Sequence, residues 1–207
     1  MPVLEASEIA TAPDLLARED HRIIADMIED SSTVLDLGCG EGDLLAWLAR
    51  HKGVKARGVE IAREKVRRCV ELGLSVYQGD INKGLADYPP ACFDYVILSQ
   101  TLQVVQQPLE LMREMRRVGR RIVVAFPNFG HWTVRLSLLC TGKAPRTGHL
   151  PYQWYDSPNI RVLTILDFEA LLREEGFCAE QSCFLRRGRR VANQPNLLAD
   201  SAIYLLS

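Results

Sequence analysis

The residues best suited to chemistry form a glycine-rich segment, VLDLGCGEGD, at residues 34–43. It contains Asp36, Gly38, Gly40 and Gly42 directly after a short apolar run. Glycines in such a turn let the backbone bend sharply and let a ligand approach where a Cβ would block it. The free N–H groups at the start of a following helix can also bind a polar ligand group. The spacing therefore predicts a strand-to-helix turn that holds a nucleotide-like ligand.

Two further carboxylates occur where later strands are expected to end. Glu60 follows Gly38 by 22 residues, the distance at which an acid accepts hydrogen bonds from ribose hydroxyls. Asp80 lies in Gln78-Gly79-Asp80-Ile81, where its carboxylate can accept the adenine amino group while Ile81 packs on the ring. Glu60 alone would fit a solvated strand end equally well. Three acids at three successive strand ends beside a glycine turn favour an adenosyl ligand.

The type of nucleotide follows from what the glycine turn lacks. In the dinucleotide fingerprint G-x-G-x-x-G, the third glycine would fall at Asp43, and a carboxylate is a poor neighbour for a pyrophosphate. The phosphate-binding pattern G-x-x-x-x-G-K-[ST] does not occur in the sequence. S-adenosylmethionine (SAM) has no phosphate and carries a sulfonium and an ammonium, which Asp36 would favour. The segment is best explained as part of a SAM site.

The elements that must position these residues alternate regularly. Apolar runs bounded by glycine or proline predict strands, and runs with 3.6-residue periodicity predict helices. The predicted strands cover residues 33–37, 54–60, 74–78, 93–98 and 121–126, and the helices cover about 14–28, 42–51, 63–72 and 108–118. Nearly continuous apolar strands indicate burial on both faces. We therefore expect a mostly parallel sheet with helices on each side.

After residue 126 the alternation stops. Residues 127–163 are expected to be an irregular, aromatic-rich insert, with Phe129, Trp132, Tyr152, Trp154 and Tyr155. Thr164 and Asp167 form a capping-box pattern that predicts a helix through residue 175. Strands at residues 178–185 and 201–206 would form an antiparallel hairpin on the sheet edge. The whole chain, residues 1–207, is expected to be a single SAM-binding α/β domain.

At these residues the sequence resembles a known superfamily. VLDLGCGEG resembles the first motif of the class I SAM-dependent methyltransferases, Glu60 their second-strand acid, and Gly79-Asp80-Ile81 their third motif. The resemblance implies a Rossmann-like fold with a mostly parallel seven-stranded sheet, helices on both faces and an antiparallel edge hairpin. Longer segments are similar to one family within it, the methionine biosynthesis family MetW. They are ILSQTLQ, FPNFGHW and LPYQWYDSPNI followed by TILDFEALL, and the likeness runs from about residue 17 to 177.

The resemblance also implies a site and a partner. By position in the motifs, the expected contacts to SAM or S-adenosylhomocysteine are Asp36, Gly38, Cys39, Gly40, Glu60, Ile61, Asp80 and Ile81. Ser99 and Gln100 would line the methyl side of the pocket. Similarity to MetW implies bacterial methionine biosynthesis beside homoserine O-acyltransferase, the enzyme that activates the homoserine hydroxyl.

A catalytic base is not identified. Many methyltransferases for small molecules have a histidine shortly after the fourth strand, where this sequence has Val104. The [D/N/S]-P-P-[Y/F] motif of amino-group methyltransferases is also absent there. His131 is a candidate base, although capping or packing of the following helix is the favoured interpretation. Tyr152 and Tyr155 are weaker candidates. Whether the protein is an enzyme therefore stays open.

Three functions fit these patterns. The first is a SAM-binding partner or regulator of homoserine O-acyltransferase, and the second is a methyltransferase for a small molecule. A weaker third is an RNA methyltransferase that uses the arginine clusters at residues 113–121 and 186–190. The aromatic insert could be a small second core, a lid or an interface, and residues 132–139 could form an amphipathic partner helix.

Composition limits the alternatives. The 207 residues are 47% hydrophobic and 25% charged with a net charge of −1, so nothing global suggests nucleic acid or an anionic membrane as a partner. Six scattered cysteines form no C-x-x-C pair, so neither a metal site nor a disulfide framework is expected. No apolar run approaches the roughly 20 residues of a membrane span, and the acidic N-terminal segment is unlike a signal peptide. We expect a cytoplasmic protein.

Overall fold

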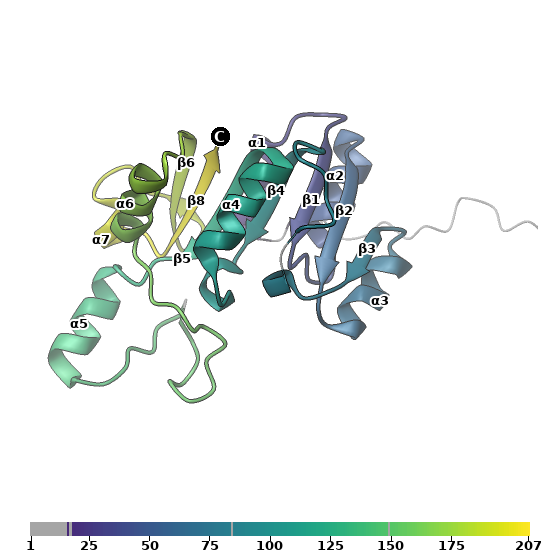
Figure 1. Cartoon of the computed structure of the whole chain (residues 1–207). Coiled ribbons are helices and arrows are strands. Elements are labelled where there is room, and N and C mark those ends of the chain that lie inside the picture. Colours follow the sequence, from purple (N-terminus) through teal and green to yellow (C-terminus); the bar gives the residue numbers. More distant parts are fainter. Residues whose placement is uncertain (1–15, 17, 84, 149) are drawn as a thin grey trace, which may run out of the picture.

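A computed structural model describes residues 16, 18–83, 85–148 and 150–207 of the chain. Within these residues one eight-stranded sheet has the order β3-β2-β1-β4-β5-β8-β6-β7 (Figure 1). The strands are β1 (Thr33–Leu37), β2 (Lys55–Glu60), β3 (Ser75–Gln78), β4 (Phe93–Ser99), β5 (Gly119–Pro127), β6 (Ala179–Arg186), β7 (Arg189–Arg190) and β8 (Ser201–Leu206). Neighbours from β3 to β5 are parallel, whereas β8 runs antiparallel to both β5 and β6.

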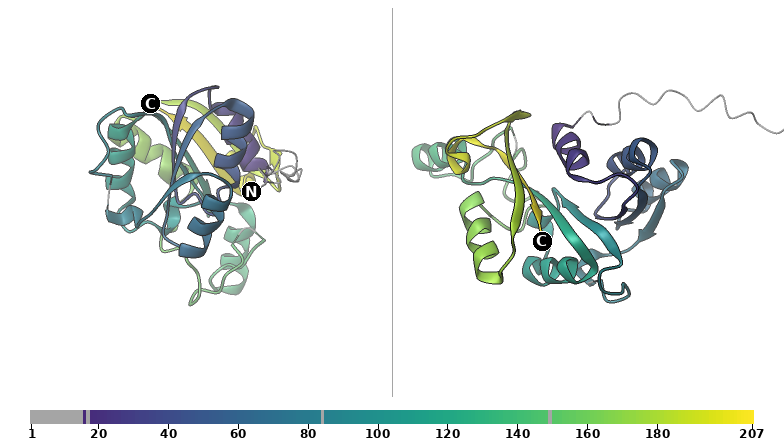
Figure 2. Two further views of the ribbon diagram at one scale, coloured as in Figure 1. Left: turned by 90° about the vertical axis from the view of Figure 1, so that its right-hand side faces the viewer. Right: turned by 90° about the horizontal axis from the view of Figure 1, so that it is seen from above.

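Helices cover both faces of this sheet (Figure 2). The helices are α1 (Glu19–Met27), α2 (Asp43–Lys52), α3 (Arg63–Glu71), α4 (Pro108–Val118), α5 (Trp132–Thr141), α6 (Ile165–Glu175) and α7 (Pro195–Leu198), with short 3-10 turns η1 (Ile81–Lys83) and η2 (Leu102–Val104). Apolar side chains of α4 and α6 pack with one set of strand residues, and those of α1 and α2 pack with the alternate set. The sheet thus has a core on each side, which explains why its central strands are almost continuously apolar.

The predicted α/β fold is confirmed, with three differences. The sheet has an eighth strand, because Arg189 and Arg190 pair back on β6. The two late strands do form an antiparallel pair, but β8 lies inside the sheet between β5 and β6. The insert at residues 127–163 is not wholly irregular, since it contains α5. Asp14, the predicted start of the first helix, lies outside the described residues.

Local signals explain where several helices begin and end. The predicted capping box opens α6: the Thr164 side chain accepts the Asp167 N–H, and the Asp167 carboxylate accepts the Thr164 N–H. Pro108 occupies the first turn of α4, where its missing N–H costs nothing. None of the helices in the described part of the chain is long and apolar enough to cross a membrane.

The insert leaves the end of β5, and its helix α5 lies apart from α4 in Figure 1. Its last part returns to the segment between β4 and α4, where the Ile160 and Arg161 N–H groups both bond the Gln103 carbonyl at 3.0 Å. Of the α5 side chains only Val134 is buried. Tyr152, Trp154 and Tyr155 are 50%, 78% and 70% exposed, so these three do not form a second core. Lid and interface remain as explanations for the aromatic residues of the insert.

Candidate functional site

The candidate site lies where the strand order reverses, at the carboxyl ends of β1 and β4. The chain leaves β1 for β2 on one side and returns through β4 on the other, the arrangement that leaves a crevice for ligands in open α/β sheets. Two adjoining cavities of about 370 Å³ and 280 Å³ open there, and both are lined by Gly38, Gly40 and Ser99. The residues expected from the sequence all line one or both of them: Asp36, Gly38, Cys39, Gly40, Glu60, Ile61, Asp80, Ile81, Ser99 and Gln100.

The glycine turn has different requirements at two of its positions. Gly40 has a φ of +60°, and a Cβ built on it would have no atom within 4 Å, so its open side faces free space. Gly42 has a φ of +83°, and a Cβ there would lie 2.6 Å from Leu74 and 2.8 Å from the Cys69 sulfur. Gly40 therefore leaves room for a ligand, whereas Gly42 lets α2 pack against α3.

Asp36 is a buried carboxyl group without a partner. Its side chain is 4% exposed, and within the described residues Oδ1 has no hydrogen-bond donor. Burial raises its pKa to about 7; the nearby Arg18 opposes this shift and Glu60 adds to it. A cationic group or a donor brought into the smaller cavity would satisfy this carboxylate, so Asp36 is the strongest candidate for a ligand contact.

Glu60 joins the end of β2 to the glycine turn. Its Oε2 accepts the Gly40 N–H at 2.9 Å, and its Oε1 accepts the Ala62 N–H at 2.9 Å. The residue is only 6% exposed, yet it lines the larger cavity. Because a carboxylate oxygen has two acceptor positions, each of these oxygens can still accept a hydroxyl from a ligand.

Asp80 and the two isoleucines form the far wall of the larger cavity. Asp80 Oδ1 accepts the Asn82 N–H and side-chain amide, both at 2.9 Å, which holds the turn η1 in place. Ile61 is 64% exposed, a large apolar side chain left open to the cavity, and Ile81 is half-buried. This wall combines a fixed acceptor with apolar surface, which suits a flat heterocycle with an amino group.

The segment after β4 offers polar atoms but no acid or base. Ser99 Oγ is buried and has no partner within the described residues. Gln100 has a left-handed φ of +53°, and its N–H is held by the Ala125 carbonyl at 2.8 Å. Val104 also lines the larger cavity. None of the cavity-lining side chains in this segment, including Thr101, titrates near neutral pH.

Several lining residues were not predicted. Arg18 borders both cavities, and its guanidinium bonds the Asp20 carboxylate at 2.5 and 3.1 Å. It precedes α1 and belongs to no motif, so no pattern in the sequence marks it. Lys65 on α3 borders both cavities as well, although the sequence pattern places it on the solvent-exposed face of that helix. Asn82 and Thr101 are the other polar residues of the larger cavity that were missed.

His131 and the first arginine cluster have structural roles. His131 caps α5, as the favoured interpretation predicted: its Nδ1 accepts the Thr133 N–H at 3.3 Å and lies 2.7 Å from the Thr133 hydroxyl. In the arginine cluster at residues 113–121, three guanidinium groups form ion pairs at 2.7 to 2.8 Å: Arg113–Glu175, Arg117–Glu114 and Arg121–Glu29. Since these guanidinium groups are paired within the protein, the cluster gives no support to RNA binding.

Comparison with known proteins identifies relatives of the whole chain. The family model described as "Methionine biosynthesis protein MetW" matches residues 18–206. The chain is 36% identical to the "Bifunctional methionine biosynthesis protein MetXA/MetW" of Rhodopirellula baltica, over 94% of this chain and 33% of that protein. This chain spans about a third of the length of the curated relatives it matches.

Solved structures with the same fold are more distant in sequence. A SAM-dependent methyltransferase from Archaeoglobus fulgidus aligns with a TM-score of 0.65 at 16% identity, covering 90% of this chain and 93% of the other. An S-adenosylmethionine-dependent methyltransferase from Mesorhizobium loti has a TM-score of 0.65 at 15% identity, covering 93% and 99%. At these identities the likeness establishes the Rossmann-like methyltransferase fold.

Proposed function

Because the chain belongs to the MetW family of methionine biosynthesis proteins, we propose that it binds SAM and acts with, or regulates, a homoserine O-acyltransferase. Binding of SAM or of its demethylated product would then report the methionine supply of the cell to the enzyme that activates homoserine. Two separate observations support the ligand and the partner.

The unpartnered Asp36 carboxylate supports the ligand. A SAM ammonium or sulfonium would neutralise this buried acid, and the open side of Gly40 leaves space for the amino-acid part. Glu60 retains acceptor capacity for ribose hydroxyls, and Asp80 with Ile81 suits an adenine ring. The residues present therefore fit the group. When bound, SAM supplies a methyl group on an activated sulfonium.

The Rhodopirellula baltica relative supports the partner. Its name joins MetW to a second component, MetXA, and this chain corresponds to a third of it. We take MetXA to be the homoserine O-acyltransferase that the family resemblance implies. Two such functions on one polypeptide are consistent with a physical association of the separate proteins. The exposed tyrosines and tryptophan of the insert provide aromatic side chains of the kind found at interfaces.

Purified chain should co-elute with the homoserine O-acyltransferase of its own cell on size exclusion, and should change the enzyme's activity. Calorimetry should give saturable SAM binding that Asp36→Asn and Glu60→Gln weaken. Asp26→Asn, an exposed substitution on α1, serves as a matched control that removes the same charge. If the proteins neither co-elute nor influence activity, with or without SAM, the partnership is rejected; unchanged SAM affinity in both site variants rejects the ligand site.

A second candidate, a methyltransferase for a small molecule, is favoured by one observation. A third cavity of about 790 Å³ shares Arg18 and Gln100 with the larger of the two cavities above. It is thus a space for an acceptor next to the predicted methyl side. Conversion of SAM to S-adenosylhomocysteine with a pool of cell metabolites would support this activity. Tight SAM binding without turnover across a broad pool would count against it.

A further inference from the structure

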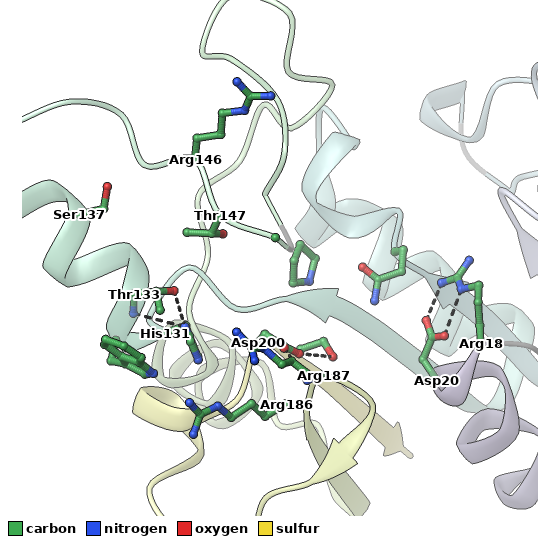
Figure 3. A pocket seen from close by; sticks show the side chains of 15 residues that line it. Arg18, Asp20, His131, Thr133, Ser137, Arg146, Thr147, Arg186, Arg187 and Asp200 are labelled. Atoms are coloured by element: carbon green, nitrogen blue, oxygen red, sulfur yellow. Dashed lines mark hydrogen bonds and ion pairs between the residues drawn. The ribbon is translucent and has the colours of Figure 1, made fainter.

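The 790 Å³ cavity has a lining that the proposed function does not explain. It lies between the start of α5, the β6–β7 hairpin, the end of β5 and Arg18 (Figure 3). Arg18, Arg146, Arg186 and Arg187 line it from three separate parts of the chain, and hydroxyl-bearing side chains such as Thr133, Ser137 and Thr147 line it as well. We call this space the arginine cavity.

The charges of the arginine cavity are not balanced within the protein. Asp20 pairs with Arg18, and Asp200 accepts the backbone N–H of Arg187 at 2.7 Å and the Ser201 hydroxyl at 3.5 Å. Among the described residues the guanidinium groups of Arg186 and Arg187 form no ion pair or hydrogen bond. Two unpaired cations beside a concave surface concentrate positive potential there, which raises the local concentration of anions.

Backbone conformation provides a second, independent observation. Arg187 and Gly188 form the two-residue turn of the β6–β7 hairpin, and both have positive φ, +49° and +74°, as in a type I′ turn. Asparagine is the usual residue at the first of these positions. Gln100, which also lines the arginine cavity, is left-handed as well. The type I′ turn requires a positive φ at both positions, so the hairpin holds Arg187 at the cavity despite the cost of this conformation for a residue with a Cβ.

We propose that the arginine cavity binds a small molecule through an oxyanion group, a carboxylate or a phosphate, held by Arg186 and Arg187. The planar guanidinium fork matches the two oxygens of either group, and the hydroxyls of the wall can bind its remaining polar atoms. The proposal goes beyond the proposed function, since it concerns a second ligand and not SAM or the acyltransferase.

The test is calorimetric titration of the full chain, without SAM or partner, with succinate, inorganic phosphate and the neutral analogue succinamide. The variant is Arg186→Gln/Arg187→Asn, in which an Asn-Gly pair suits the type I′ turn and should preserve the hairpin. The matched control is Arg189→Gln/Arg190→Gln, which removes the same charge from the exposed β7 strand outside the cavity. Thermal melts check that all proteins are folded.

We expect one or both anions to bind saturably and succinamide not to bind. The Arg186→Gln/Arg187→Asn variant should weaken anion binding on the order of tenfold or more, because charge-assisted hydrogen bonds are lost, while the control variant keeps it. The preferred anion then identifies the ligand class. Absence of binding by both anions, equal binding of succinamide, or equal loss in the control variant would overturn the proposal. SAM affinity and acyltransferase co-elution are measured separately, so failure of the proposed function leaves this result unaffected.

Discussion

Replacement of Asp36 by asparagine should make the stability of the protein less dependent on pH. In the folded protein, burial raises the Asp36 pKa to about 7 from an ordinary value of 3.8. Between these two values the folded state holds a proton that the unfolded state has lost. The contribution of Asp36 to the free energy of unfolding is therefore fully present below pH 3.8 and is lost as the pH rises through 7. Asparagine has nearly the same shape and does not titrate.

The expected magnitude follows from the width of that interval. Each pH unit over which the two states differ by one proton changes the free energy of unfolding by about 1.4 kcal/mol. Two such units lie between pH 5 and the folded-state pKa of about 7. Relative to Asp36→Asn, the wild-type protein should thus lose about 2.8 kcal/mol of stability from pH 5 to pH 8.

Urea denaturation at pH 5, 6, 7 and 8 measures this difference directly. Asp26→Asn, which removes an exposed carboxyl group from α1, is the matched control. If the wild-type and Asp36→Asn curves stay parallel over this range, Asp36 is not protonated in the folded protein and the reasoning is wrong. Under the proposed function, SAM should also bind about tenfold more weakly at pH 6 than at pH 8, because binding must first displace that proton.

Three other substitutions test the packing and hydrogen bonding of the fold. Asn128→Ala should destabilise the protein by about 3 kcal/mol in urea denaturation, because the fully buried amide bonds four backbone groups, including the Ala199 carbonyl at 2.8 Å. Asp94→Asn should lower the melting temperature at pH 7 but much less at pH 3. Hydrogen bonds from Thr33 hold the pKa of Asp94 below its usual range, so the stability that this carboxylate contributes is lost as the pH falls through the lowered pKa. Gly42→Ala should lower the free energy of unfolding by roughly 2 kcal/mol or more, because alanine would have to adopt a left-handed φ and its Cβ would displace two packed side chains. A melting temperature unchanged from wild type would contradict this.

Much of the parallel half of the fold could be predicted from the sequence, because its signals are local. The strand β1 and the helix α4 have the predicted bounds, since apolar runs stopped by glycine and a helix opened by proline depend on neighbouring residues. The same holds for the α6 capping box. The position of β8 inside the sheet could not be predicted, because strand order depends on pairing between distant segments.

The candidate site shows the same division. Asp36, Glu60 and Asp80 could be found because strand ends of a parallel sheet meet at one edge, so their spacing in the chain implies proximity. Arg18 could not, since its place at the cavity depends on how α1 packs on the sheet. The arginine cavity was missed for the same reason: residues 186–190 appeared in the sequence as a basic turn, and only the fold brings Arg186 next to α5.

The position of β8 also constrains the order in which the sheet can form. β8 follows β6 along the chain, yet it pairs with β5 on one side and β6 on the other. During synthesis on the ribosome, β5 therefore emerges with an open, apolar edge that stays uncovered until β8 has left the exit tunnel. Exposed strand edges of this kind promote aggregation of nascent chains, and pairing over long sequence separation is slow. We expect the yield of folded protein in the cell to depend on chaperones, and truncation before β8 to give insoluble chains.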